Sequence, residues 1–278
     1  MSMARKIRCM VELVTDHGDQ VYTVDLRPER PLPSFRPGQF LHLTLDEYDP
    51  SGFWPESRVF SIASSPVDRS RLTIIYSVKG QYTSRMEREL HSGKAVWVKL
   101  PYGEFVVDGG MDAVLISGGT GITAFQAFIE GLAPNHPNKV VLLYGARRPG
   151  LLVGREKIEE KAFCTSNFRA YYFSEAPVVT APALSLPKGV SPVPVDEDAS
   201  DTPSMGSFNN AQDGSGQAAA TTGGIIDGRV NLDLLKDCPL NASAVYYLAG
   251  PPPMVAALTN ELAQRGVSGH NVRVDAWE

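Results

Sequence analysis

Hydrophobic and polar positions alternate over short segments through the first hundred residues, which predicts β structure. These segments are rich in β-branched and aromatic residues, and turn signals such as Pro37-Gly38 separate them. Six short strands at this spacing predict a small antiparallel barrel that closes its own edges. A helix is expected among them at 83–91, where good helix formers follow a Thr/Ser start. The expected strands are 6–14, 20–26, 40–45, 59–63, 72–78 and 95–100.

Beyond about residue 107 the pattern changes to apolar strands that alternate with helices. This alternation predicts βαβ units and a parallel sheet. The domain boundary is expected near 106–112, so that residues 1–107 form a barrel domain and residues 108–278 an α/β domain. The expected strands are 113–117, 139–146, 168–174, 244–250 and 271–277, and the expected helices are 123–132, 153–161, 231–237 and 252–265.

The stretch 177–224 fits neither pattern. It holds six prolines and six glycines in 48 residues, with one lysine against five acidic residues. Such a composition buries too little apolar surface to offset the entropy of ordering the chain. We therefore expect a flexible acidic insertion, and a loop with no role of its own is the alternative.

Composition and charge exclude several classes of protein. The 278 residues carry 26 basic and 31 acidic side chains, and this net charge of -5 argues against a nucleic-acid partner. Apolar runs end well before 18 residues, and the first residues do not resemble a signal peptide, so no membrane span is expected. Three distant cysteines, Cys9, Cys164 and Cys238, predict neither a disulfide framework nor a metal cluster, and they favour a cytoplasmic location.

A glycine-rich turn at 118–122 (GGTGI) follows a predicted strand and opens a predicted helix. Glycines let backbone N–H groups approach a phosphate, and a helix N-terminus favours an anion. The acidic ribose ligand of the commonest dinucleotide fold is missing, since that position lies near Tyr144. The turn therefore indicates a dinucleotide site of another kind, or simply a tight connection between strand and helix.

Three further positions are candidates for ligand contact. Arg58 and Phe60 lie two residues apart on a strand and so share a face, where they can hold an anion beside an aromatic ring. The alternative is an edge-strand arginine beside a core phenylalanine. Thr83 and Ser84 begin a helix, where hydroxyls suit a phosphate or form an ordinary cap. Gly250 ends a predicted parallel strand, the place where ligands dock in such sheets.

Taken in order, these motifs resemble the ferredoxin–NADP reductase superfamily. The resemblance covers nearly the whole chain except 177–224. It implies a flavin-binding antiparallel Greek-key β-barrel followed by an α/β parallel-sheet domain for the pyridine nucleotide. The matching segments are FRPGQF (35–40), RVFSIASSP (58–66), PYGEF (101–105), GGTGI (118–122), LYGARRP (143–149), FSE (173–175), GRV (228–230) and AGPPPM (249–254).

For the flavin, the resemblance implies a role for each residue of the matching segment. Arg58 would pair with the FAD pyrophosphate, and Phe60 would pack on the isoalloxazine ring. Ser61 would hydrogen-bond near flavin N5, the atom that accepts hydride, and Ile62 continues the same cofactor-binding segment. Trp277 stands where family members place an aromatic residue near the flavin, or it is a terminal packing residue. The candidate catalytic residues are thus Ser61, Phe60 and Trp277.

The phosphates and the nicotinamide are assigned in the same way. Thr83 and Ser84 would hold the FAD phosphates, and Gly250, Pro251 and Met254 would line the approach of the nicotinamide. The dinucleotide phosphates of NADH or NADPH would lie on Gly118, Gly119, Thr120 and Gly121, with Arg147 as a further candidate ligand.

Two departures from the family pattern bear on the nucleotide. Ala249 stands where many members have a cysteine beside the nicotinamide, so its orientation must depend on other groups. Glu175 stands where NADP-specific relatives bind the 2′-phosphate, and its charge favours NADH. Arg147, Arg148 and Arg155 favour the opposite choice.

The implied function is electron transfer from NAD(P)H through FAD to an iron–sulfur protein or an oxygenase component. One alternative is a reductase that releases free reduced flavin. Another is a non-catalytic subunit that uses the acidic insertion as a docking tether. Residues 58–99 carry eight basic and three acidic side chains, which form either a solvated face or a surface that steers an acidic partner.

Overall fold

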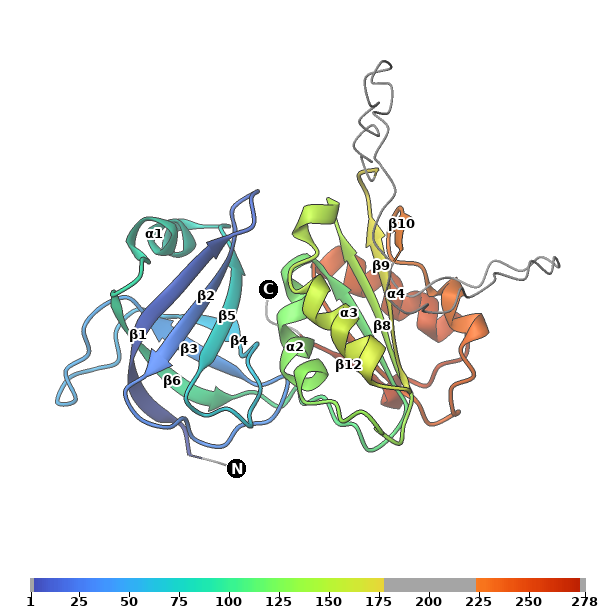
Figure 1. Cartoon of the computed structure of the whole chain (residues 1–278), viewed down its shortest axis with the longest axis horizontal. Helices are drawn as coiled ribbons and strands as arrows, with labels where there is room; N and C mark the ends of the chain where they lie inside the picture. Colours follow the sequence, from blue (N-terminus) through green and yellow to red (C-terminus); the bar gives the residue numbers. More distant parts are fainter. Residues whose placement is uncertain (1–2, 178–223, 276–278) are drawn as a thin grey trace, which may run out of the picture. The chain divides into compact units, whose positions relative to one another are not determined.

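The computed structural model describes residues 3–177 and 224–275, which form two six-stranded sheets with helices around the second (Figure 1). The expectations for Trp277 and for the interior of the 177–224 stretch fall outside the described residues and stay predictions. In the described part of the chain, no helix is long and apolar enough to cross a membrane. No group of three or more candidate metal ligands is found there either.

The first sheet is antiparallel, as the alternating pattern predicts. Its strand order is β4-β3-β6-β1-β2-β5, and α1 (Gln81–Glu89) lies between β5 and β6 in sequence. Along β1, Ile7, Cys9 and Val11 are buried while the residues between them are not, so one face of the strand lines the core. The strands are β1 (Arg5–Asp16), β2 (Val21–Pro28), β3 (Phe40–Thr44), β4 (Arg58–Ser61), β5 (Leu72–Ser77) and β6 (Ala95–Tyr102).

This barrel is nearly closed. Its edge strands are β4 and β5, and no ladder of paired residues joins them in the described chain. Just beyond β4, the Ala63 N–H donates a hydrogen bond to the Thr73 carbonyl, with an N–O distance of 2.9 Å. The predicted antiparallel barrel is thus confirmed as a nearly closed one, with a seam between β4 and β5.

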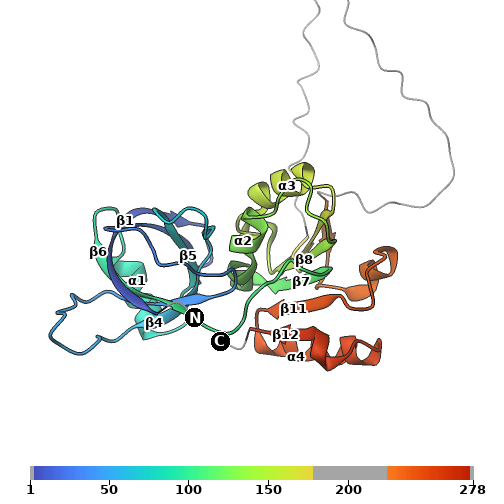
Figure 2. The same ribbon diagram turned by 90° about the horizontal axis from the view of Figure 1, so that it is seen from below.

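The second sheet is parallel throughout, with the strand order β10-β9-β8-β7-β11-β12. Figure 2 shows α2 (Thr123–Glu130) and α3 (Arg155–Cys164) on one side of it and α4 (Pro252–Gln264) on the other. Both faces are therefore covered, which explains the continuous apolar runs. The strands are β7 (Ala113–Gly118), β8 (Val140–Ala146), β9 (Phe168–Ser174), β10 (Ile225–Asp227), β11 (Val245–Ala249) and β12 (Val272–Val274).

Side chains on the two faces of β7 pack in two separate hydrophobic cores. Ala113 and Leu115 pack with α2 and α3 side chains, while Val114 and Ile116 pack with α4. Each strand residue is thus buried on one side or the other, and all four are fully buried. A single polar substitution in this strand would leave an unpartnered group in one of the cores.

Several boundaries differ from the sequence predictions. The helix α1 begins two residues earlier than expected, because Gly80 is its N-cap. The helix α3 begins at Arg155, since Gly154 before it has a left-handed backbone (φ 78°). The segment expected as a helix at 231–237 is a 3-10 helix, Leu232–Asp237. The short edge strand β10 was not predicted, because three residues carry too little periodicity.

Close approach of neighbouring atoms, backbone at Gly121 and side chain at Gly118, explains two glycines of the 118–122 turn. Residues Gly119–Ile122 of this turn form a 3-10 helix ahead of α2. A Cβ atom added to Gly121 would lie 2.4 Å from the Ala249 carbonyl oxygen, and one added to Gly118 would lie 2.6 Å from the Met254 sulfur. The turn therefore packs directly against the end of β11 and the start of α4.

We expect Gly121→Ala to destabilise the protein by about 1–3 kcal/mol, because the methyl group meets rigid backbone. Gly150→Ala is the matched control, since a Cβ there meets nothing within 4 Å. Urea unfolding of both variants measures the difference. Equal stability of the two would contradict the close approach.

The three cysteines are unbonded and differ in exposure. Cys9 and Cys238 are buried, and Cys164 is exposed. Burial raises the pKa of the Cys9 thiol to about 12, which leaves it protonated at pH 8. A chromogenic disulfide reagent at pH 8 should therefore titrate one thiol quickly in the native protein and three after denaturation. Rapid reaction of all three in the native state would contradict the structure.

Candidate functional site

A cavity of about 410 Å³, here called the seam pocket, opens where the barrel fails to close. Edge strands that face each other without a ladder present unpaired N–H and C=O groups, which can bond a flat polar ring. Its lining comes from β4, β5, the start of α1 and the glycine-rich turn. The lining residues of most interest are Arg58, Phe60, Ser61, Thr83, Thr120, Gly121, Ala249 and Gly250.

Arg58 is held in one orientation at the rim of this pocket. Its side chain is 48% exposed, and Nη2 lies 3.0 Å from Glu56 Oε1. Nη1 donates a hydrogen bond to the Ser57 carbonyl at 2.9 Å. The guanidinium carbon lies 4.8 Å from the centre of the Tyr82 ring. The Arg58 guanidinium, which the motif assigns to a phosphate, is thus paired with the exposed carboxylate of Glu56 in this structure.

Phe60 and Ser61 line the seam pocket, but Ile62 does not. Phe60 is partly buried and contacts Tyr76 edge to face, with ring centres 6.2 Å apart. Ile62 is fully buried in the barrel core, and its N–H donates to the Gln39 carbonyl. The Ile62 side chain is therefore part of the core, and a contact between this residue and a cofactor stays a prediction.

The two hydroxyls at the start of α1 have different surroundings. Thr83 Oγ1 accepts hydrogen bonds from the N–H groups of Lys79 (2.9 Å) and Gly80 (3.1 Å), so it closes the N-terminal turn of the helix. Thr83 also lines the seam pocket, so both the cap and the phosphate interpretation fit it. Ser84 lines neither pocket described here, because it lies one position further around the helix.

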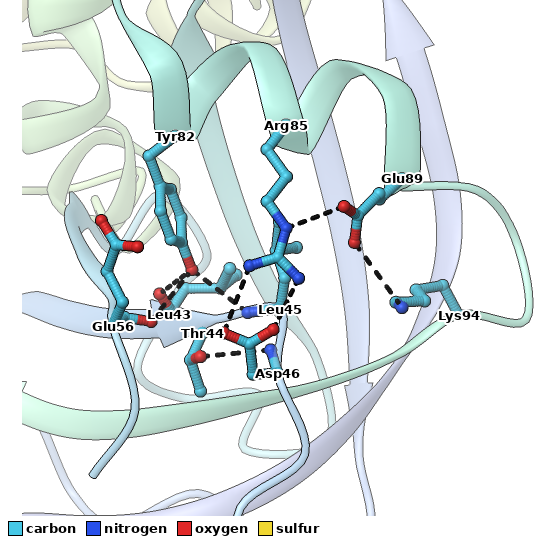
Figure 3. Close-up of polar contacts among 9 residues, drawn as sticks. All are labelled: Leu43, Thr44, Leu45, Asp46, Glu56, Tyr82, Arg85, Glu89 and Lys94. Carbon is cyan, nitrogen blue, oxygen red and sulfur yellow. Dashed lines mark hydrogen bonds and ion pairs between the residues drawn. The ribbon is translucent and has the colours of Figure 1, made fainter.

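Figure 3 shows how α1 is fastened to the end of β3. The Tyr82 hydroxyl donates to the Leu43 carbonyl (3.0 Å) and accepts from the Leu45 N–H (3.1 Å). One turn later, Arg85 binds Asp46 (2.5 Å) and Glu89 (2.7 Å). The hydrogen bond from Arg85 is the main cause of the lowered pKa of the Asp46 carboxyl. These contacts fix the helix that carries Tyr82 and Thr83.

A second cavity of about 820 Å³, here called the sheet-edge pocket, lies at the carboxyl ends of β7, β8, β9 and β11. Ligands of open α/β sheets bind at this edge. The structure thus brings together motifs that are more than 130 residues apart in sequence. Its lining includes Gly118, Gly119, Thr120, Gly145, Arg147, Glu175, Arg229, Val230, Pro251 and Met254.

Gly119 is the open member of the glycine-rich turn. Its backbone has a φ of +55°, which L side chains rarely adopt, and a Cβ there would meet nothing within 4 Å. Gly250 has a φ of +147°, and a Cβ atom added to it would lie 2.9 Å from the Gly118 nitrogen. The positive φ angles of Gly119 and Gly250, and the close approach of Gly250 to Gly118, therefore require glycine at the mouth of the pocket. The open space at Gly119 leaves its backbone accessible to a ligand.

The charged side chains at the sheet-edge pocket are paired with one another in ways that the sequence did not predict. Glu175 forms an ion pair with Arg229 at 3.2 Å, and both side chains line the pocket. Arg147 also lines it, but Arg148 pairs with Asp19 at 3.0 Å and is not among the lining residues. Sequence reasoning missed Arg229 as a charge partner, although the segment GRV was singled out.

Arg155 and three arginines of the basic segment 58–99 form ion pairs with carboxylates. Arg155 pairs with Glu159 at 2.6 Å and does not line the sheet-edge pocket. Within the segment, three arginines pair with carboxylates that lie outside it: Arg58 with Glu56, Arg71 with Glu130 and Arg85 with Asp46. These pairs cancel most of the positive excess counted from sequence, which favours the solvated-face interpretation.

Comparisons with known proteins agree with this architecture. No protein-family model matches the chain. It is 27% identical over 262 residues to the reductase component of phenol 2-monooxygenase from Pseudomonas sp. (strain CF600), covering 92% of this chain and 61% of that protein. It is 23% identical over 255 residues to a flavohemoprotein of Rhizobium meliloti (strain 1021), covering 89% and 54%. The chain thus spans little more than half the length of these relatives.

A solved structure matches over its full extent. The ferredoxin NADP+ reductase of Neisseria gonorrhoeae, determined with bound FAD and NADP, superposes with a TM-score of 0.65 at 17% identity, and the match covers 99% of each chain. At this identity the likeness concerns the fold. The chain has the two-domain fold of this reductase, which is the fold that the resemblance in the sequence implies.

Proposed function

We propose that the chain is an FAD-dependent NAD(P)H oxidoreductase, with FAD on residues 1–107 and the nicotinamide nucleotide on residues 108–278. The observation that carries the proposal is the junction of the two pockets. Ser77, Lys79 and Thr120 line both the seam pocket and the sheet-edge pocket, so ligands in the two would meet there. A reductase of this type needs its two cofactors in contact.

The residues of the seam pocket fit a flavin dinucleotide. Arg58 supplies the cation for the pyrophosphate, and the N-terminus of α1 with Thr83 offers a second phosphate contact. Phe60 presents an aromatic surface for the flavin ring, and Ser61 a hydroxyl for its edge. When bound, FAD would accept two electrons as a hydride from the nicotinamide and release them one at a time. The protein's part is to bind, orient and exclude water.

The sheet-edge pocket fits the nicotinamide nucleotide. Gly119 leaves backbone accessible for the phosphates, and Gly250, Pro251 and Met254 shape the approach towards the seam pocket. Glu175 at the end of β9 carries a negative charge where a 2′-phosphate would add two more, and so favours NADH. Arg229 offsets part of that charge, and Arg147 is the alternative phosphate ligand.

The acceptor is proposed as an iron–sulfur protein or an oxygenase component. One relative is named as a reductase component of a phenol monooxygenase, which supports this class of partner. Whether the protein retains FAD distinguishes this proposal from the alternative of a reductase that releases free flavin. Stoichiometric FAD that stays bound through gel filtration supports an electron-transfer component, whereas flavin that leaves with each turnover supports the alternative.

We expect Arg58→Ala to weaken FAD binding about tenfold or more, because a charge-assisted hydrogen bond contributes about 1.5–3 kcal/mol. Arg27→Ala is the control, since Arg27 also pairs with a carboxylate, Glu12, but lines neither pocket. The ratio of flavin to protein after purification and a fluorescence titration measure the effect. Unchanged occupancy in Arg58→Ala would remove Arg58 from the site.

We expect Glu175→Arg to raise kcat/KM for NADPH relative to NADH, since it replaces a repelling charge by an attracting one. Glu156→Arg makes the same change of charge on α3 outside the sheet-edge pocket and should leave the ratio unaltered. Steady-state kinetics with both nucleotides and a dye acceptor give the ratio. A strong preference of the unaltered protein for NADPH would contradict the assignment and favour Arg147 as the phosphate ligand.

A further inference from the structure

The guanidinium of Arg58 rests on the face of an aromatic ring. Its central carbon lies 4.8 Å from the centre of the Tyr82 ring, and Tyr82 is only 4% exposed. An arginine that is half exposed samples many rotamers in water, and each hydrogen bond it forms must offset that freedom. Stacking on a fixed ring restricts these rotamers before any ligand arrives.

Tyr82 is itself fixed relative to the strand that carries Arg58. Its hydroxyl donates to the carbonyl of Leu43, and Leu43 is the residue directly opposite Arg58 in the β3–β4 ladder. It also accepts from the Leu45 N–H and lies 3.4 Å from the Glu56 carbonyl oxygen (Figure 3). Tyr82 therefore connects α1 to the end of β3 and to the loop that leads into β4.

The helix beneath the ring cannot shift easily. Arg85, three residues after Tyr82 and so on the same helix face, binds both oxygens of Asp46 at 2.5 and 3.2 Å. Its Nε donates to Glu89 at 2.7 Å, and Lys94 lies 3.9 Å from the other oxygen of Glu89 (Figure 3). A bidentate arginine pair holds a defined geometry better than a single contact does.

Glu56 marks the side of the guanidinium that is available to an anion. Its carboxylate, 61% exposed, takes Nη2 of Arg58 at 3.0 Å, while Nη1 is bound to the Ser57 carbonyl. The ring face and the backbone contact thus leave for an anion the N–H edge that the Glu56 carboxylate now occupies. Because the Glu56 carboxylate is exposed, we expect a phosphate group to replace it on that edge.

We propose that Tyr82 is a positioning residue of the anion site: its anchored ring holds Arg58 so that the N–H edge of the guanidinium faces the phosphates of FAD. The inference rests on the proposed function, because it takes the anion to be the FAD pyrophosphate. Tyr82 is a lining residue of the seam pocket but is only 4% exposed, so we expect its effect to pass through Arg58, to be confined to ligands that carry phosphate and to be lost when Arg58 is absent.

The test is a flavin titration of the full chain, freed of bound flavin, with FAD and with riboflavin, which lacks phosphate. Tyr82→Leu should raise the Kd for FAD about two- to fivefold and leave the Kd for riboflavin unchanged. In the Arg58→Ala background, Tyr82→Leu should have no further effect on FAD. Tyr82→Phe keeps the ring and should bind FAD more tightly than Tyr82→Leu does.

Arg58→Lys is the second variant, since it keeps the charge, loses the planar group that stacks, and leaves the barrel core untouched. It should weaken FAD but not riboflavin. Equal effects of Tyr82→Leu on both flavins, or additive effects with Arg58→Ala, would show a merely structural role and overturn the proposal. So would FAD binding by Arg58→Lys equal to that of the unaltered protein, and this result decides the matter if Tyr82→Leu does not fold.

The same titration separates failure of this inference from failure of the proposed function. If the unaltered protein binds neither FAD nor riboflavin, the proposed function is wrong. If it binds FAD and Arg58→Ala weakens that binding while Tyr82→Leu does not, the proposed function stands and only the positioning role fails.

Discussion

The edge strands β4 and β5 of the antiparallel sheet come together without forming a ladder, and the seam between them opens into the pocket that we propose for the flavin. A closed barrel of this size would fill its interior with side chains and offer no unpaired backbone. Here the Ala63–Thr73 hydrogen bond joins the strands at one end only, and the rest of the seam opens into a pocket. The glycine-rich turn of the second sheet lines the same pocket, so one structural irregularity brings both domains to one site.

Much of the fold could be predicted because long elements repeat their pattern many times. The alternation in β1 and the continuous apolar run of β7 each identify a strand and the way it is buried. Short elements fail this test: β10 has three residues, and the 3-10 helix Leu232–Asp237 has the composition of an α-helix. Helix starts at Gly80 and Gly154 depend on backbone conformation, which sequence pattern does not report.

The candidate site was predicted unevenly, for a physical reason. Residues within one motif, such as Arg58 and Phe60, keep a spacing that fixes their common face. Pairs between distant segments have no such signal. Glu175 meets Arg229 across 54 positions, and Tyr82 reaches Leu43 across 39. The count of positive charges in 58–99 was misleading for the same reason, because the neutralising carboxylates Glu56, Glu130 and Asp46 lie outside that segment.

Ala249 shows how packing and chemistry constrain each other at the junction. It ends β11 and is 1% exposed, and its carbonyl is the atom that forbids a side chain at Gly121. Its methyl group, where many family members carry a thiol, offers the nicotinamide neither a polarisable nor a hydrogen-bonding group. If the nicotinamide binds here as proposed, its orientation would depend on shape, supplied by the backbone of Gly121 and Gly250 and by the flexible thioether of Met254. Since that backbone is held by the close approach of two glycine-bearing turns, the precision of the site depends on the same contacts that stabilise the second domain.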